Sequence, residues 1–168
     1  MSPSYPKATQ TRKPKGEKKV KVAKLDPDFF FSLCVRESTN WTCSNCGKKY
    51  ETWESQKGYP ANPGLHCSHY IGRANYAVRF DPMDADPHCY GCHAKFEGNP
   101  HVFKEWKLGK LGQEKYDILI ERSNDIMLGK LARKEKQQIA EHYKAQYEYM
   151  ARMRQVQPEG SIGFVGYF

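Results

Sequence analysis

Two pairs of cysteines have the spacing of metal ligands. Cys43 and Cys46 form one Cys-x-x-Cys pair, and Cys89 and Cys92 form another. Structural zinc sites are usually tetrahedral with thiolate ligands, and a tight turn lets both cysteines of a pair face one ion. Because positions 47–88 separate the pairs, each pair can tie one end of a long insert to the same metal. We therefore predict one structural zinc ion, whose binding energy, on the order of 10 kcal/mol, would stabilise a small core.

The alternatives for these cysteines are a redox pair or separate free thiols. Both fit less well, because four thiols in two matching pairs supply a complete ligand set for one ion. The remaining two of the six cysteines, Cys34 and Cys67, stand in apolar or strand-like segments, and we predict that they are small buried residues. Without an apolar leader, this pattern also argues against secretion and against a disulfide framework.

Histidines gather in the same stretch of sequence. Five of the six lie between positions 66 and 101, which is not expected of residues that only fill a core: His66, His69, His88, His93 and His101. His69 lies in a strand-like run, and His93 follows the last paired cysteine, where a helix would begin. Phosphodiester hydrolysis needs an uncoordinated imidazole as the base and a second group that holds a divalent cation at the phosphate. The simpler alternative for His69 is a buried, hydrogen-bonded strand residue.

Basic residues are concentrated at the N-terminus. The net charge is +8, and residues 1–24 hold eight Lys or Arg against one Glu, so they carry +7 of it. Such a segment gains affinity for nucleic acid by counterion release without reading its sequence. The lack of apolar periodicity predicts a disordered arm, and a solvated terminus without a partner is the simpler interpretation. The candidate nucleic-acid-binding residues of this arm are Arg12, Lys13, Lys15, Lys18, Lys19 and Lys21.

The elements that must position the cysteines and histidines fall into four segments. Residues 1–24 form the arm, 25–122 the zinc-bound domain, 123–156 a long C-terminal helix, and 157–168 an aromatic tail. Apolar residues make up 39% of the chain, and no stretch approaches the roughly 18 apolar residues of a membrane span. We expect one small domain in a soluble, cytoplasmic protein with no membrane partner.

Local signals place the elements after the second cysteine pair on helices. Asn99-Pro100 is typical of an N-cap followed by proline, and predicts a short helix that ends at Gly109. Residues 113–122 predict a second short helix, and Asn124 can cap the long one. The run from Asp28 to Arg36 is dense in apolar residues and is either a helix or a strand.

The long helix carries a narrow apolar stripe. Tyr143, Tyr147 and Met150 are spaced four and three residues apart, so they share one face of an otherwise charged helix. Such a stripe suits packing against a partner helix, as in a homodimer. It suits folding back onto its own domain equally well.

Several of these motifs together resemble the NinG (Rap) recombination proteins of lambdoid phages, over roughly residues 40–122. The layout of cysteine pair, histidine strand, cysteine pair and helix is also similar to that of the phage junction resolvase endonuclease VII. Both belong to the HNH, or His-Me finger, nucleases. The motifs that carry the resemblance are His69-Tyr70-Ile71-Gly72-Arg73, Arg79-Phe80-Asp81, Cys89-Tyr90-Gly91-Cys92-His93, Gly98-Asn99-Pro100, Phe103, Trp106, Leu111-Gly112 and Tyr116.

The resemblance implies an α+β fold, with a small zinc-stapled ββα-metal core and a helical C-terminal extension. It identifies His69 as the catalytic base, His93 as a ligand of a catalytic Mg²⁺ or Mn²⁺ ion, and the four paired cysteines as ligands of structural zinc. Arg73 falls where these phage proteins carry an arginine that could hold phosphate. Arg79 is a further candidate for DNA binding.

Two positions of the HNH pattern hold other residues in this chain. Ser68 stands just before the base, where HNH enzymes often carry an acidic or histidine metal ligand, so we take His66 as the substitute ligand. On a regular strand His66 would face away from His69, so this assignment requires a twist or a bulge. The middle position of the pattern, usually Asn, is assigned to Asp84. Other candidates nearby are Asp81 and Asp86, with His88 as a further candidate ligand.

The function implied by the resemblance is that of a metal-dependent DNA endonuclease that cuts branched or Holliday-junction DNA in phage recombination. It would act in the cytoplasm of the host cell, as a homodimer because resolution takes two coordinated cuts, and with phage recombination proteins as further partners. Two alternatives remain open. One is a catalytically silent, zinc-stapled nucleic-acid-binding module, and the other is an HNH nicking enzyme that acts on plain duplex DNA.

Overall fold

A computed structural model describes residues 24–168. The predicted basic arm, with its candidate DNA-binding residues from Arg12 to Lys21, lies outside the described residues. Within them the chain is α+β, as predicted, with two small antiparallel sheets of two strands each. The elements are α1 (Pro27–Ser38), β1 (Trp53–Glu54), β2 (Pro60–Ala61), β3 (Leu65–His69), β4 (Ala85–Cys89), α2 (Tyr90–Gly98), α3 (Pro100–Leu111), α4 (Gln113–Ser123), α5 (Ile126–Lys134) and α6 (Lys136–Val156).

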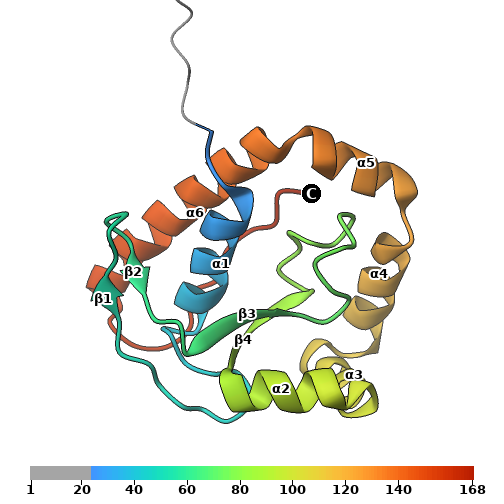
Figure 1. Cartoon of the computed structure of the whole chain (residues 1–168), viewed down its shortest axis with the longest axis horizontal. Coiled ribbons are helices and arrows are strands. Elements are labelled where there is room, and N and C mark those ends of the chain that lie inside the picture. The colour runs from blue at the N-terminus through green and yellow to red at the C-terminus, as the bar shows by residue number, and fades with distance from the viewer. Residues whose placement is uncertain (1–23) are drawn as a thin grey trace, which may run out of the picture.

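The β3–β4 hairpin lies in the middle of the molecule, with the helices arranged around it (Figure 1). Leu65 pairs with Cys89 at one end of the hairpin, and His69 pairs with Ala85 at the other. The five pairs of this ladder are consecutive, so β3 contains no bulge. Because α2 begins at Tyr90, directly after β4, the hairpin and this helix follow one another as strand, strand and helix.

The apolar run near the N-terminus forms a helix, which settles the choice between helix and strand. The Asp26 carboxylate accepts a hydrogen bond from the Asp28 backbone N–H at 3.0 Å, and Pro27 occupies the first turn. Both are favourable at a helix start, since Asp satisfies a free donor there and proline needs no partner. The helix then buries Phe30, Phe31 and much of its remaining apolar face.

Helix α6 lies across α1 (Figure 1), and its apolar stripe is buried between them. The Tyr143 ring meets Phe31 edge-on at 5.0 Å, and its hydroxyl donates to the Phe80 carbonyl. Tyr147 and Met150 are buried on the same face. The stripe is therefore occupied by its own domain, and the expectation that it packs against a partner helix in a homodimer is wrong.

The segment expected to form one long helix over 123–156 is divided into α5 and α6 at Glu135. Asp125 rather than Asn124 caps α5, since its carboxylate accepts from the backbone N–H groups of the next turn. Helix α5 packs so closely on the loop after β3 that a Cβ at Gly129 would lie 3.4 Å from the Ala77 nitrogen. One straight helix cannot follow both that loop and α1, and the break at Glu135 lets each half pack on its own neighbour.

A second group of aromatic side chains joins α2 to α3. Phe96 and Phe103 stack with their ring centroids 4.6 Å apart, and Trp106 lies 5.4 Å from Phe96. The predicted start of α3 at Asn99-Pro100 is confirmed, although the helix continues past Gly109 to Leu111. Across residues 24–168, no helix is long and apolar enough to cross a membrane.

The packing of α6 on α1 should contribute much of the stability. We expect Met150→Ala to lower the free energy of unfolding by about 2–5 kcal/mol, because Met150 is fully buried and its loss leaves a cavity. Tyr149→Ala, at a side chain that is 50% exposed, should change it by less than about 0.5 kcal/mol. Urea denaturation measures both, and equal losses would contradict this packing.

Candidate metal centre and adjacent histidine cavity

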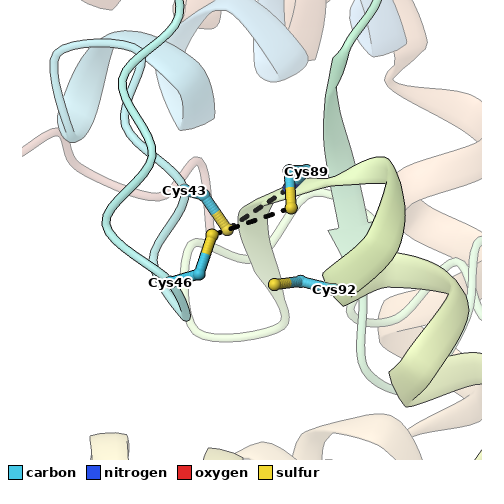
Figure 2. A group of neighbouring side chains, drawn as sticks. All are labelled: Cys43, Cys46, Cys89 and Cys92. Atoms are coloured by element: carbon cyan, nitrogen blue, oxygen red, sulfur yellow. Dashed lines mark hydrogen bonds between the residues drawn. The ribbon is translucent and has the colours of Figure 1, made fainter.

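The four paired cysteines converge at one point, as their spacing predicted (Figure 2). Their sulfur atoms all lie within 4.8 Å of one another, and the Cys46 and Cys89 sulfurs are 3.8 Å apart. Four thiolates at about 2.3 Å from a tetrahedral zinc ion stand about 3.8 Å from each other. The cluster of Cys43, Cys46, Cys89 and Cys92 can therefore hold a metal ion such as zinc.

Local backbone geometry brings each cysteine pair into position. In the first pair, the Cys43 N–H donates to the Lys48 carbonyl at 2.9 Å, and the Gly47 N–H donates to the Cys43 carbonyl at 3.0 Å. Gly47 adopts a φ of 72°, which only glycine takes up readily, so the turn closes on itself. In the second pair, Cys89 is the residue before α2 and Cys92 lies in its first turn.

Hydrogen bonds to sulfur favour ionisation of part of this cluster, whereas burial and the neighbouring thiols raise the pKa of Cys92 to about 12. The Cys89 backbone N–H donates to the Cys43 sulfur at 3.3 Å, and the Asn45 side-chain amide donates to the Cys92 sulfur at 3.2 Å. Burial opposes ionisation of Cys89, but the backbone N–H of Cys92 and the neighbouring thiols outweigh it and lower its pKa to about 7. A thiolate at the N-terminus of a helix is stabilised in this way.

A cavity of about 660 Å³ lies beside this cluster, between α1, β3 and α2. It brings together four of the predicted site residues: His66, His69, Arg73 and His93. Asp28 from α1 and Glu97 from α2 also line it, and neither is among the site residues predicted from the sequence. The spacing of Glu97, four residues after His93 on a helix, is a signal that could have identified it.

His69 is held in one tautomer by the backbone. Its Nε2 lies 3.0 Å from the carbonyl oxygen of Arg79, and a carbonyl can only accept, so Nε2 carries the proton. Nδ1 is then the nitrogen with a free lone pair. Burial lowers the pKa of His69 to about 4, although the bond to Arg79 opposes this change. The imidazole is therefore neutral at pH 7, as a general base must be.

The two arginines near His69 differ in how tightly they pair with Asp28 and in how exposed they are. The Arg79 guanidinium holds both carboxylate oxygens of Asp28, at 2.9 and 2.7 Å, and donates to the Arg73 carbonyl at 2.7 Å. This bidentate pair keeps the pKa of Asp28 low against the effect of burial, and Arg79, whose side chain is 15% exposed, is not among the residues that line the cavity. The prediction that Arg79 contacts DNA is therefore not supported by its position. Arg73 is 60% exposed and meets Asp28 at 3.3 Å.

His93 contacts three neighbours that could orient it. Its Nδ1 lies 3.0 Å from the Ser68 hydroxyl, and its Nε2 lies 3.2 Å from a Glu97 carboxylate oxygen. The His66 ring is 5.1 Å from the His93 ring, centroid to centroid. Burial and the nearby His93 together lower the pKa of His66. Ser68 thus supports His93 through a hydroxyl that can donate or accept.

His66 and His69 line the same cavity, and of the twist or bulge expected to bring them together, β3 contains no bulge. However, the cysteine cluster is the sole group of three or more His, Cys, Asp or Glu side chains within residues 24–168 whose ligand atoms converge closely enough for one metal ion. His66, His93 and Glu97 are near one another but do not form so compact a set.

Asp84, the residue assigned to the middle position, lies apart from the cavity. Its carboxylate accepts from the Ile71 backbone N–H at 2.8 Å, and its carbonyl accepts from the buried Lys107 ammonium at 3.0 Å. Burial raises the pKa of Asp84 to about 7. Because this carboxylate closes the loop after β3, its position does not support a catalytic role.

The other candidates around Asp84 also have structural partners. Asp86 is buried between Lys107 and Lys110, and Asp81 pairs with Arg122 at 2.9 Å. His88 is fully buried among aromatic rings, and burial lowers its pKa to about 4. None of these three side chains lines the cavity.

Compared with protein-family models, with curated proteins and with solved structures, the chain gives no significant match. The resemblance to the HNH nucleases therefore stays a prediction. The function has to be inferred from the geometry of the cysteine cluster and of the cavity.

The cysteine cluster predicts one metal ion per chain. We expect purified protein to carry close to one equivalent of zinc, and Cys92→Ser to lose most of it, because three thiolates bind zinc more weakly than four. Cys34→Ala, at a buried cysteine outside the cluster, should keep the metal. Elemental analysis measures the zinc, and a metal-free wild-type protein would contradict the assignment.

Removal of zinc from the wild-type protein gives a second test that does not depend on a variant. A chelator should lower the midpoint of thermal unfolding, because metal binding to the native state alone stabilises it. An unchanged midpoint after zinc is removed would show that the cluster is not a structural metal site.

Proposed function

We propose that this protein is a metal-dependent DNA endonuclease of the HNH type, acting on branched or Holliday-junction DNA. One observation carries the proposal: the cavity beside the cysteine cluster holds a neutral His69 of fixed tautomer together with Arg73 and His93. A base, a cation for phosphate and a group able to hold a divalent metal are the three parts that phosphodiester hydrolysis needs.

His69 acts as the general base. With its proton on Nε2, directed at the Arg79 carbonyl, it takes the proton of an attacking water on Nδ1. The phosphate is held by the Arg73 guanidinium, which is exposed at the cavity and presents donors in a planar fork that matches phosphate oxygens. Charge that develops on the phosphate oxygens is stabilised by the same guanidinium.

The residues that would hold a Mg²⁺ or Mn²⁺ ion are His93, His66 and Glu97. Two imidazoles and one carboxylate on one wall suit an ion that accepts both nitrogen and oxygen ligands, and Mn²⁺ accepts nitrogen more readily than Mg²⁺ does. The bond between Ser68 and His93 Nδ1 fits a ligating histidine, whose second nitrogen usually has a partner. When bound, such an ion neutralises charge on the scissile phosphate and the leaving oxygen.

The succession of β3, β4 and α2 supports the assignment to the ββα-metal type. His69 ends β3, and His93 lies in the first turn of α2, four residues after the Cys89 that ends β4. With zinc as the metal, the cysteine cluster would fix that first turn from the side opposite to β3. The strand histidine and the helix histidine would then face one cavity, as the resemblance implies.

The branched substrate, the homodimer and the phage recombination partners are inferred from the resemblance to NinG and endonuclease VII. Junction resolution needs two cuts, so two copies of the cavity would have to act together. Since the apolar stripe at Tyr143 is buried within the chain, a dimer would use another surface.

One observation favours a catalytically silent, nucleic-acid-binding module as the second candidate. His66, His93 and Glu97 do not converge as compactly as the four cysteines do. A protein of this kind would bind DNA and keep its zinc without cutting. The third candidate, a nicking enzyme for plain duplex, differs only in its substrate.

The role of His69 can be tested directly. We expect His69→Ala to reduce cleavage of a labelled four-way junction by at least about 100-fold in Mg²⁺ or Mn²⁺, because a general base contributes about 10²–10⁴-fold. His101→Ala, at an exposed histidine of α3, should leave the rate unchanged. Gel analysis measures cleavage, with zinc content and DNA binding as checks that both variants are folded.

The same assay separates the candidate functions. Cleavage of the junction but not of a linear duplex of the same sequence supports the proposal, and equal cleavage of both supports the nicking enzyme. A wild-type protein that retards the junction without cutting it in either metal is the binding module. Full activity of His69→Ala would refute the base assignment.

The pH dependence gives an independent test of His69. Because burial lowers its pKa to about 4, it stays unprotonated down to about pH 5. We expect kcat/KM to be nearly constant from pH 7 to pH 5, whereas a free imidazole with a pKa near 6.5 would lose activity roughly 20-fold over that range. Zinc content is measured at each pH, and a steep loss near pH 6.5 with zinc retained would contradict the assignment.

A further inference from the structure

Three cations gather around one half-buried aromatic ring close to the histidine cavity. The Tyr76 ring lies 4.8 Å from the Arg79 guanidinium, 4.6 Å from that of Arg133 and 5.0 Å from the Lys136 ammonium. Each cation gains about 0.5–1 kcal/mol from such a ring at an exposed site. Like charges gathered around one ring also repel one another, so the arrangement favours an added anion.

Only one of the three cations has a carboxylate partner in the part of the chain that the structure describes. Arg79 is neutralised by Asp28 through two hydrogen bonds. No carboxylate among residues 24–168 lies within 4.0 Å of the Arg133 or Lys136 charge. Arg133 and Lys136 are both exposed, so their donors are open to a ligand from solution.

The acidic residue between these two cations is turned away from them. Glu135 separates α5 from α6, and its carboxylate accepts a hydrogen bond from the Tyr167 hydroxyl at 3.1 Å. Tyr167 belongs to the C-terminal aromatic tail, whose backbone is held in turn by the Tyr143 hydroxyl at 3.2 Å. The tail thus engages the carboxylate that stands between Arg133 and Lys136 in the sequence.

Arg79 connects this group of cations to the candidate base. Its carbonyl accepts from His69, and its guanidinium lies over Tyr76. The loop that carries Tyr76 also packs against α5 at Ala77. The Tyr76 ring therefore lies between Arg79, which orients His69, and the cations of α5 and α6.

We propose that Arg133 and Lys136 bind the phosphate backbone of DNA next to the cavity, on the DNA strand that runs past His69. In this proposal, Tyr167 keeps the surface around Arg133 and Lys136 positive by holding the Glu135 carboxylate. This inference depends on the proposed function. A polyanion with regularly spaced charges fits two unpaired cations better than a single small anion does, since each cation can meet its own phosphate.

The salt dependence of DNA binding tests the inference. For the double variant Arg133→Gln and Lys136→Gln, we expect the slope of log affinity against log salt to become shallower by about 2, since each phosphate contact to duplex contributes about 0.9. The matched control is Lys130→Gln with Lys134→Gln. This control removes two exposed charges from α5, the helix that carries Arg133, and neither of them lies over Tyr76. It should change the slope by less than half as much as the double variant does.

A second pair of variants tests the role of the tail. Tyr167→Phe removes only the hydroxyl that holds Glu135, and we expect it to weaken DNA binding at low salt because the carboxylate can then approach Arg133 and Lys136. Adding Glu135→Gln to Tyr167→Phe should restore the affinity. A loss that Glu135→Gln does not rescue would show that Tyr167 acts only through folding and would overturn this part of the proposal.

The outcomes distinguish this inference from the proposed function. If the wild-type protein binds junction DNA but the Arg133 and Lys136 double variant has the same salt slope as its lysine control, the inference is wrong and the proposed function stands. If the wild-type protein neither binds nor cuts DNA, the proposed function fails as well.

Discussion

The arrangement of the whole candidate site depends on the point where β4 ends and α2 begins. Cys89 closes the hairpin ladder by pairing with Leu65, and it is also the residue before the first turn of α2. The turn that follows carries Cys92 toward the other thiols and His93 toward the cavity. A metal at the cysteines would therefore fix more than the fold. It would set the direction of α2 and with it the distance between the histidines of the strand and the helix.

A second constraint acts from α1. Asp28 follows the cap of that helix and holds the Arg79 guanidinium by two bonds, so it fixes a loop residue more than fifty positions away. Arg79 in turn aims its carbonyl at His69. The bond gives this half-buried imidazole a partner, and a polar group removed from water without one costs about 1–3 kcal/mol. The same bond that satisfies His69 also decides which of its nitrogens is basic.

The sequence predicted the features that depend on local spacing and failed on those that depend on long-range contacts. The start of α3 at Asn99-Pro100 was predicted because it follows from adjacent residues. Glu97 could have been found in the same way. The convergence of the cysteines is the exception, since Cys46 and Cys89 lie 43 positions apart and the pairs were matched by the ligand set that one ion needs. The break at Glu135 and the burial of the Tyr143 stripe depend on how α5 and α6 pack on elements distant in sequence, which no local pattern reports.

The two arginines of the loop show the same limit and explain how an acidic residue can line a cavity that is proposed to bind phosphate. Arg79 is mostly buried and bidentate to Asp28, and breaking such a pair leaves a charge poorly compensated. Arg73 meets the same carboxylate at 3.3 Å while 60% exposed, and pairs of that kind contribute roughly 0–1 kcal/mol. A phosphate can therefore displace Asp28 from Arg73 at little cost while Arg79 stays in place. Sequence alone treats the two as equivalent cations, whereas their different burial makes one a fixed support and the other an exchangeable donor.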